Sequence, residues 1–236
     1  MALPYFYTDD YDPAQESLSL DEDTSKHVVQ VLRMKPGEGL RLTDGRGNLL
    51  SCTIVDDNKR RCLVSINDKE FHAPQARRVS IAISLLKNPS RFEWFLEKAT
   101  ELGVSEIIPL ICERTEKEKF RADRLSGICI AAMLQSQQSW LPSLHKPVAF
   151  SEWIGNPPPA TDLWIAHCLP GEKNELGHHR THKPNTVACI GPEGDFTKEE
   201  IAAAILNGFI PAGLGNTRLR AETAGVVAAA LLVQSA

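Results

Sequence analysis

The chain lacks the features that mark membrane, secreted and repeat proteins. No uninterrupted apolar run is long enough to cross a bilayer, so we expect no transmembrane segment. Residues 1–10 have no basic region followed by an apolar core, so we expect no signal peptide. No internal repeat and no low-complexity tail is present. With 236 residues, 42% hydrophobic and 24% charged, the composition fits an ordinary globular protein of one large or two smaller domains.

The cysteine and histidine patterns give no metal or redox signature. None of the six cysteines forms a C-x-x-C pair, and most lie in apolar runs, as small buried residues do in a reducing compartment. His178–His182 is rich in histidine, but it is typical of a loop between Gly177 and Pro184 with few other ligands nearby. We therefore expect a cytoplasmic protein without a metal site.

A strong positive charge is also missing, since the net charge is −4 at pH 7. Residues 26–61 nevertheless contain eight basic and four acidic residues, a local balance of +4, and an acidic stretch precedes them. A locally basic domain could contact phosphates. Charge alone, however, favours the simpler interpretation of a solvated β-barrel surface.

The first 72 residues predict a small β-barrel. Tight-turn residues at Asp44–Asn48 separate two of the expected strands, and a short amphipathic helix is expected over Ser25–Arg33. The expected strands are Gly39–Asp44, Leu49–Val55 and Arg61–Ile66.

The pattern changes to α/β near Ala73–Gln75. Val79–Leu86 is almost continuously apolar, as in a strand buried on both faces, and Pro89–Leu102 has helical spacing with Trp94 expected in the core. Val104–Cys112 is strand-like again, so this unit predicts a parallel sheet. Further expected elements are helices over 121–138, 197–207 and 222–234, and strands over 163–168, 186–190 and 209–210.

Two glycine-containing segments, Ile190–Phe196 and Leu214–Ala224, carry the strongest functional signal. Each follows a short apolar run and leads into a helix-like sequence, so their backbone N–H groups could face one ligand. Gly191 and Gly194 would allow close approach of the backbone. Neither a G-x-G-x-x-G motif nor a Walker lysine is present, which excludes the common nucleotide motifs.

Charged residues in the second segment could perform chemistry. Arg220 could neutralise an anionic substrate, and Glu222 could steer it or accept a proton. The alternative is that the two form a structural ion pair or helix cap. His167 could line the same pocket, or it could be a core histidine whose hydrogen bonds are satisfied.

Together these segments resemble the signatures of the SPOUT methyltransferases, and the whole chain resembles the RsmE family, which methylates N3 of one uridine in 16S ribosomal RNA. The matching stretches, in chain order, are His27–Gly37, Asp44–Gly47, Glu97–Val104, Ile190–Gly194 and Leu219–Ala224. The resemblance implies a PUA-like RNA-binding β-barrel in residues 1–72. It also implies an α/β methyltransferase domain in residues 73–236, with a deep trefoil knot and a parallel sheet flanked by helices.

The resemblance also implies a homodimer that binds S-adenosyl-L-methionine and acts on 16S rRNA or the small ribosomal subunit. The cofactor-binding residues it implies are His167, Leu169, Ile190, Gly191, Gly194, Leu214, Gly215 and Leu219. The candidate RNA-binding residues are Lys26, Arg33, Arg41, Arg46 and Arg218. Arg220 and Glu222 become the catalytic candidates, with Arg220 stabilising negative charge on the uracil or a phosphate and Glu222 orienting Arg220 or helping to remove the proton.

The chain departs from the family pattern at several positions. The family often has proline and arginine at Asn216 and Thr217, lacks Arg218, and often has glycine at Asp195. Two alternatives therefore stay open: an RNA-binding module with a vestigial cofactor site, and a SPOUT methyltransferase that acts on another RNA.

Overall fold

The computed structural model describes residues 3–178 and 183–234, which form two compact units. The first unit comprises residues 1–74 and 133–141, and the second comprises residues 75–132 and 142–236. Across the described residues, no helix has both the length and the apolar character that a membrane crossing requires.

The first unit is a five-stranded sheet in the order β1-β3-β4-β5-β2, in which only the β1–β3 pair is parallel. Its elements are β1 (Tyr5–Tyr7), β2 (Ser17–Ser19), α1 (Glu22–Lys26), the π-helical turn η1 (His27–Val31), β3 (Gly39–Thr43), β4 (Asn48–Asp56) and β5 (Leu63–Phe71). Leu18 at one edge belongs to the same buried cluster as Leu42 and Val64, so the sheet curls around one core.

The β3–β4 turn and the short helical region of the first unit match the expectations from the sequence to different degrees. The β3–β4 turn forms as expected, because Asp44 Oδ1 accepts hydrogen bonds from the N–H groups of Arg46 at 2.8 Å and Asn48 at 3.2 Å. The short helix expected over Ser25–Arg33 forms with other bounds and in two parts. The α-helix α1 ends at Lys26, and a π-helical turn follows, in which the Leu32 N–H bonds to the His27 carbonyl at 2.9 Å.

The second unit contains an eight-stranded sheet, and every pairing in it among the described residues is parallel. Its strands are β6 (Arg78–Ser84), β7 (Glu106–Ile111), β8 (Ser143–Leu144), β9 (Val148–Ala149), β10 (Thr161–Ala166), β11 (Asn174–Glu175), β12 (Asn185–Ile190) and β13 (Ile210–Gly213). Its helices are α2 (Pro89–Glu101), α3 (Ala122–Gln135), α4 (Phe150–Ile154), the 3-10 turn η2 (Leu176–His178), α5 (Lys198–Leu206) and α6 (Ala221–Gln234).

The order of the strands in this sheet differs from their order in the chain. The sheet runs β11-β13-β10-β12-β6-β7-β8, so β13 pairs with β10 rather than with β12, which precedes it in sequence. Helix α6 then returns to pack on β6, β12 and α2. A return of this kind is required by the knot that the family resemblance implied.

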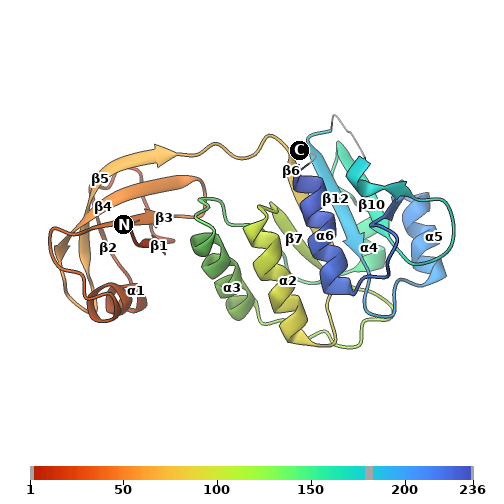
Figure 1. Cartoon of the computed structure of the whole chain (residues 1–236), viewed down its shortest axis with the longest axis horizontal. Helices are drawn as coiled ribbons and strands as arrows, with labels where there is room; N and C mark the ends of the chain where they lie inside the picture. The colour runs from red at the N-terminus through yellow and green to blue at the C-terminus, as the bar shows by residue number, and fades with distance from the viewer. Residues whose placement is uncertain (1–2, 179–182, 235–236) are drawn as a thin grey trace. The chain divides into compact units, whose positions relative to one another are not determined.

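Alternating side chains of β6 divide the core between the two faces of the sheet. Ile83 faces α6 and α2, where it lies close to Gly225, whereas Ala82 belongs to a cluster with Phe150 of α4 and Ile201 of α5. Figure 1 shows α2 and α6 lying along the near face of the sheet. The near-continuous apolar run of β6 therefore reflects burial on both faces.

Helix ends in this unit follow their sequence signals. Asn88 caps α2 by accepting from the Ser90 N–H at 3.0 Å, and Gly103, with φ of 85°, follows its end. The capping box of α5 is complete: Thr197 Oγ1 accepts from the Glu200 N–H at 3.2 Å, and Glu200 Oε2 accepts from the Thr197 N–H at 2.8 Å.

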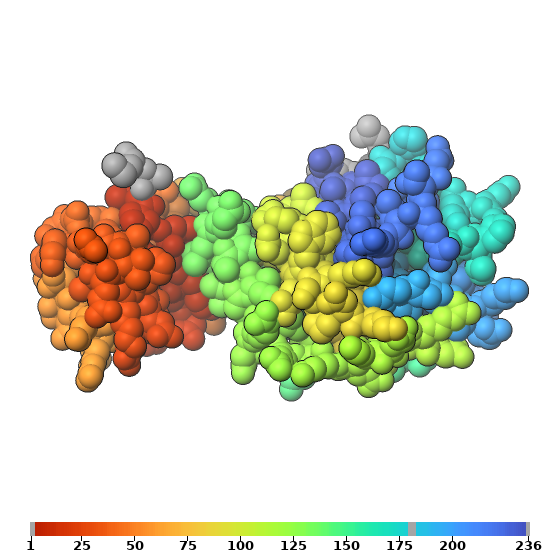
Figure 2. Space-filling view, turned by 60° about the horizontal axis from the view of Figure 1, so that its bottom comes forward, coloured from red at the N-terminus to blue at the C-terminus, as the bar shows by residue number. Residues whose placement is uncertain are grey.

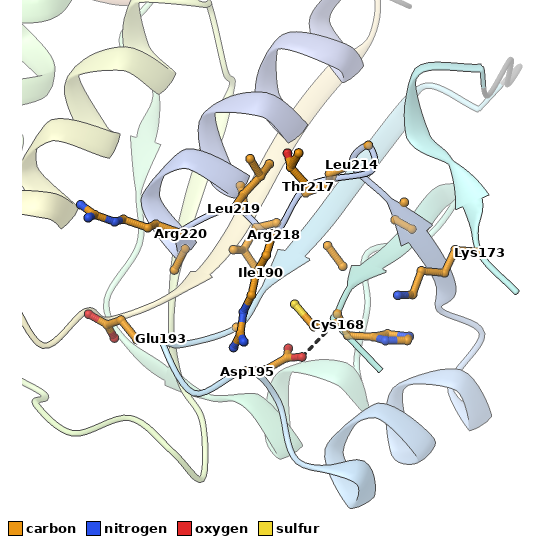
Figure 3. A pocket seen from close by; sticks show the side chains of 18 of the residues that line it. Cys168, Lys173, Ile190, Glu193, Asp195, Leu214, Thr217, Arg218, Leu219 and Arg220 are labelled. Carbon is orange, nitrogen blue, oxygen red and sulfur yellow. Dashed lines mark hydrogen bonds between the residues drawn. The ribbon is translucent and has the colours of Figure 1, made fainter. Parts of the chain in front are cut away.

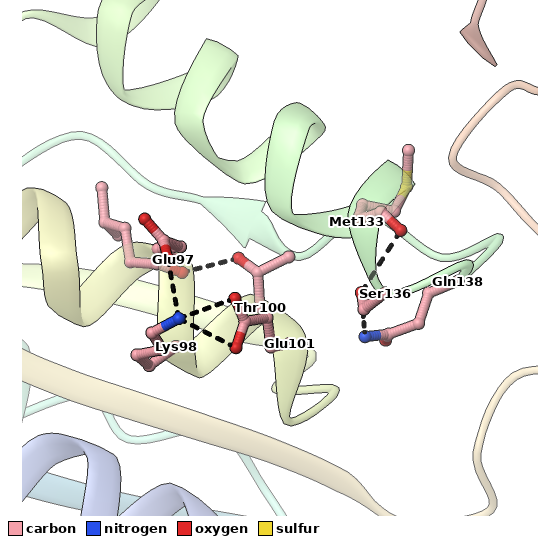
Figure 4. A network of polar contacts seen from close by, with 8 residues as sticks. Glu97, Lys98, Thr100, Glu101, Met133, Ser136 and Gln138 are labelled. Carbon is pink, nitrogen blue, oxygen red and sulfur yellow. Dashed lines mark hydrogen bonds and ion pairs between the residues drawn. The ribbon is translucent and has the colours of Figure 1, made fainter. Parts of the chain in front are cut away.

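The outer face of α2 is polar, apart from one large apolar residue. Lys98 Nζ lies 2.7 Å from Glu97 and 2.9 Å from Glu101 (Figure 4), although such surface pairs add little net stability. The expectation that Trp94 lies in the core is wrong, because its side chain is 42% exposed. It lies two residues after the buried Phe92, about 200° around the helix.

Gly225 offers a direct test of how α6 packs on α2. A Cβ added there would lie 2.7 Å from the Phe95 ring and 3.0 Å from Ile83 Cδ1. We expect Gly225→Ala to lower the free energy of unfolding by about 1–3 kcal/mol, measured by urea denaturation, because the overpacked helix must shift.

Gly127→Ala in α3 is the matched control, since nothing lies within 4 Å of its added Cβ. Alanine should raise stability there by about 0.5–1 kcal/mol through helix propensity alone. Equal effects of the two substitutions would contradict this packing.

Candidate functional site

A cavity of about 920 Å³ lies at the carboxyl ends of β10, β12 and β13 (Figure 3). Because parallel strands end at the same edge of a sheet, the loops that follow these three strands meet there. The two glycine-containing segments of the sequence form two of the walls, and the loop that begins at His167 forms a third. The volume is in the range of sites that hold a small molecule.

Most of the predicted site residues in the second unit line this cavity. They are His167, Ile190, Gly191, Leu214, Gly215, Arg218, Leu219 and Arg220. Further lining residues that the motifs did not assign to a site include Arg91, Cys168, Lys173, Glu175, Glu193 and Asp195. No motif pointed to Arg91, which lies beside the buried face of α2, four residues before Phe95, and only the tertiary fold brings it to the cavity.

Three predicted site residues do not line the cavity that the described residues form. Leu169 packs against the core cluster that contains Phe196. The Gly194 carbonyl accepts a hydrogen bond from Arg114 Nη1 at 2.6 Å, and Glu222 is buried at the start of α6. Leu169 thus supports the wall through packing, and Gly194 shapes the turn through its backbone.

Glycine at position 191 serves internal packing. An added Cβ would lie 3.0 Å from both the backbone nitrogen and the ring of Phe196, so the residue is small because its own chain approaches closely. This internal contact is a reason for glycine that the sequence did not show, and the approach of the Gly191 backbone to a ligand stays a prediction. At Gly194 an added Cβ would meet the Arg114 side chain at 3.3 Å.

Asp195 joins two walls of the cavity. It adopts φ of 65°, a left-handed conformation that favours glycine but that Asp tolerates. Its Oδ1 accepts from the Phe196 N–H at 2.8 Å, and its Oδ2 accepts from the Cys168 N–H at 2.7 Å. The carboxylate thereby ties the turn after β12 to the loop after β10, as the dashed line in Figure 3 shows.

The acidic partner of Arg91 is Glu222. Arg91 Nε lies 3.7 Å from Glu222 Oε1, and the Glu222 side chain is only 8% exposed. No ion pair joins Glu222 to Arg220 among the described residues, and Glu222 Oε2 has no hydrogen-bond partner there. The described residues therefore place Glu222 in contact with Arg91 and not with Arg220, and its part in removing the N3 proton stays a prediction.

The two arginines of the second segment point in different directions. Figure 3 shows that the Arg218 side chain extends toward Asp195, whereas the Arg220 side chain extends in another direction, away from Asp195. Both are exposed and both line the cavity. Their positive charge is therefore presented to two different parts of the opening.

His167 is a neutral side chain with unused hydrogen-bonding capacity. Burial and the nearby Lys173 charge lower the pKa of His167 from its ordinary value near 6.5, which keeps the imidazole uncharged at neutral pH. Both ring nitrogens are buried and have no partner among the described residues. A ligand in the cavity could satisfy them.

The cysteines have no shared site. Five of the six are buried, and burial raises the pKa of Cys52 to about 11 and of Cys112 to about 12, so these thiols are unreactive. Cys168 is exposed at the cavity. No group of three or more potential metal ligands occurs within residues 3–178 and 183–234, and His179–His182 lie outside the described residues.

The four basic candidates of the first unit are all exposed but come from different elements. Lys26 ends α1 and pairs with Glu22 at 2.8 Å, and Arg33 follows η1 with φ of 57°. Arg41 lies in β3, and Arg46 in the β3–β4 turn. All four side chains are accessible to a polyanion.

The comparisons with known proteins extend over both units. A family model described as "RNA methyltransferase domain" matches residues 73–233, and one described as "RNA methyltransferase PUA domain" matches residues 20–67. A relative from Synechocystis sp. named ribosomal RNA small subunit methyltransferase E is 31% identical over 212 residues, which cover 86% of this chain and 68% of the relative.

Solved structures match the whole chain closely. A probable rRNA-methyltransferase from Porphyromonas gingivalis has a TM-score of 0.90 and 35% identity, covering 99% of this chain and 98% of its own. A ribosomal RNA small subunit methyltransferase E from Neisseria gonorrhoeae, bound to S-adenosyl methionine, has a TM-score of 0.88 and 27% identity, covering 98% and 97%.

Substitutions at Asp195 separate its backbone role from its side-chain role. Asp195→Ala should destabilise the protein by about 1–3 kcal/mol in urea denaturation, because it loses the bond to the Cys168 N–H and retains the strained φ. Asp195→Gly should cost less, since glycine relieves the strain, and Asp195→Asn should cost least, since it keeps an acceptor. If Asn is as costly as Ala, the tie between the two loops is not stabilising.

Proposed function

This chain belongs to the family of RNA methyltransferases that includes ribosomal RNA small subunit methyltransferase E, and we propose that it transfers a methyl group to N3 of one uridine in 16S rRNA. It is an S-adenosylmethionine-dependent rRNA methyltransferase with a SPOUT-type α/β fold and a PUA-like N-terminal domain. The single observation that carries the proposal is the cavity in which three backbone loops meet beside Arg220.

The residues present fit S-adenosylmethionine. The buried ring nitrogens of His167 need partners, which the polar groups of an adenosyl moiety could supply. Glu175, Glu193 and Asp195 place carboxylates on the walls, as suits a ligand with a cationic sulfonium and an ammonium group. We propose that His167, Ile190, Gly191, Leu214, Gly215 and Leu219 hold it directly. Leu169 and Gly194 would support that wall.

Arg220 is the proposed residue for charge stabilisation. S-adenosylmethionine supplies, when bound, a methyl group on a positively charged sulfur. The N3 atom of uracil carries a weakly acidic proton, and a guanidinium at the cavity favours the anionic base that remains when the proton leaves. Arg220 is exposed and lines the cavity, so it can reach a base presented there. Holding the base in place should supply much of the acceleration.

Glu222 is proposed to act through Arg91. Because Glu222 is buried and its Oε1 faces Arg91 Nε, it holds a second guanidinium at the same cavity. Glu222 also lies in the first turn of α6, where the positive end of the helix dipole attracts an acidic side chain. Arg91 and Arg220 together would form a cationic opening suited to the ribose-phosphate backbone of the target.

The remaining proposals concern the RNA and the assembly. We propose that residues 1–72 bind RNA and residues 73–236 catalyse, with Lys26, Arg33, Arg41 and Arg46 contacting phosphates and Arg218 assisting at the cavity. We also propose a cytoplasmic homodimer acting on 16S rRNA or the small ribosomal subunit. Val226, Val227 and Ala230 of α6 are only partly buried in the single chain, which supports a place for this helix in the interface.

Arg220→Ala should lower the rate constant for methyl transfer by about 100- to 1,000-fold, by analogy with the loss of one preorganised charge-stabilising donor. Arg220→Lys should retain part of the activity, because it keeps the charge but loses the planar fork. S-adenosylmethionine affinity, measured by calorimetry, should stay within about threefold of wild type. Near wild-type turnover of Arg220→Ala with normal RNA binding would remove this role.

The target itself is tested in a deletion strain. Mass spectrometry of its 16S rRNA should show loss of one 3-methyluridine, which the wild-type gene restores and the Arg220→Ala gene does not. Unchanged 3-methyluridine with another methylated nucleotide lost would indicate a different RNA target. Absence of saturable heat with S-adenosylmethionine would instead indicate a vestigial cofactor site.

A further inference from the structure

A second cavity, of about 270 Å³, lies in the methyltransferase unit outside the site described above. It forms where the segment that follows β7 passes the first turns of α2, and Figure 2 shows these two parts of the chain, lime and yellow, side by side on one face. Its residues are Leu85, Leu86, Pro89, Phe92, Glu93, Lys119, Arg121, Arg124 and Leu125.

The lining has two chemical parts. Leu85, Leu86, Phe92 and Leu125 are buried and form an apolar floor. The rim is basic, with Lys119, Arg121 and Arg124 all exposed. An apolar floor with a cationic rim suits a ligand that is flat and apolar at one end and anionic at the other.

Only one of the three cations of the rim is neutralised. Arg124 donates two hydrogen bonds to the Glu93 carboxylate, from Nε to Oε1 at 2.6 Å and from Nη2 to Oε2 at 2.9 Å. The same contact lowers the pKa of Glu93, so this carboxylate stays charged and stays engaged. Among the described residues no ion pair forms at Lys119 or Arg121, although the Arg121 charge also helps to lower the pKa of Glu93, so the rim keeps a net positive charge.

The two cavities are neighbours along α2. Arg91 lines the first cavity, and the next two residues, Phe92 and Glu93, line the second. Leu85 and Leu86 follow the carboxyl end of β6, which pairs with β12 at the edge where the first cavity opens. A single RNA strand could therefore reach both cavities with consecutive nucleotides.

Methylation at N3 also affects the nucleotide beside the target. N3 lies on the Watson–Crick edge, so the target uracil must leave its pair and its stack before it can react. The adjacent base then loses one stacking partner and exposes an apolar face. A protein surface that covers this face and binds the neighbouring phosphate would stabilise the extruded conformation.

We propose that the second cavity binds the base of a nucleotide adjacent to the target uridine, with Lys119 and Arg121 holding its phosphate. Phe92 and Leu125 provide the surface against which the base packs. The inference rests on the proposed function, because it assumes an RNA substrate whose target base enters the first cavity. It adds a determinant of sequence and shape recognition within the catalytic unit, separate from the basic residues of the N-terminal unit.

The test uses the full-length protein with an RNA fragment that the wild type methylates. The double variant Lys119→Glu/Arg121→Glu should weaken RNA affinity by about tenfold or more, since at least one phosphate contact becomes repulsive. S-adenosylmethionine affinity should be unchanged. The matched control is Lys117→Glu/Lys146→Glu, which reverses two exposed lysines of the same unit that line neither cavity, and it should change RNA affinity by less than about threefold.

Location is tested by photocrosslinking. With 4-thiouridine placed singly on either side of the target, one position should crosslink to peptides containing Phe92 or residues 119–125, and the Lys119→Glu/Arg121→Glu variant should lose that crosslink. The inference would be overturned if the two double variants weakened RNA affinity equally, or if the crosslinks mapped only to other peptides. In either case, methylation by the wild type would leave the proposed function intact. If the wild type methylates no RNA, the proposed function and this inference fail together.

Discussion

The site depends on the parallel pairing of β10 between β12 and β13. Because all three strands end at one edge of the sheet, three loops that are remote in sequence meet and enclose one cavity. If β13 had paired beside β12 instead, the segment from Leu214 to Arg220 would face another part of the sheet. Helix α6 then returns over β6, and its approach to Phe95 at Gly225 sets where Arg220 and Glu222 lie.

Structure that is decided within a few residues of sequence could be predicted. The Thr197–Glu200 capping box, the Asp44 turn and the start of α2 after Asn88 each depend on hydrogen bonds between near neighbours, and all three form. Buried strands such as β6 were also visible, because burial on both faces requires a continuous apolar run. The α/β class followed from such strands alternating with helices.

Contacts between remote segments could not be predicted from local patterns. Glu222 looked like a partner for Arg220 because the two are close in sequence, yet the fold brings it to Arg91. The tie from Asp195 to the Cys168 N–H likewise depends on β10 and β12 being adjacent. Residues 133–141 join the N-terminal unit although no change of composition marks them. The exposure of Trp94 could have been predicted from helical geometry, because it lies about 200° around α2 from the buried Phe92.

Backbone and side chains divide the work of this site in a way that bears on how it can vary. The walls are built from turns whose shape is held by internal contacts, such as Gly191 against Phe196, so many wall residues can differ while the cavity keeps its form. Asp195 illustrates this, because aspartate retains the left-handed conformation that glycine would adopt and adds a bond to the neighbouring loop. Under the proposed function, recognition of RNA has less freedom, because it depends on the positions of individual charged side chains. Arg91 pairs with Glu222 and Arg124 pairs with Glu93, and each pair has one member, Arg91 or Glu93, in the first turns of α2. The start of α2 is therefore the part of the catalytic unit where a change of side chain should alter substrate choice without altering the fold.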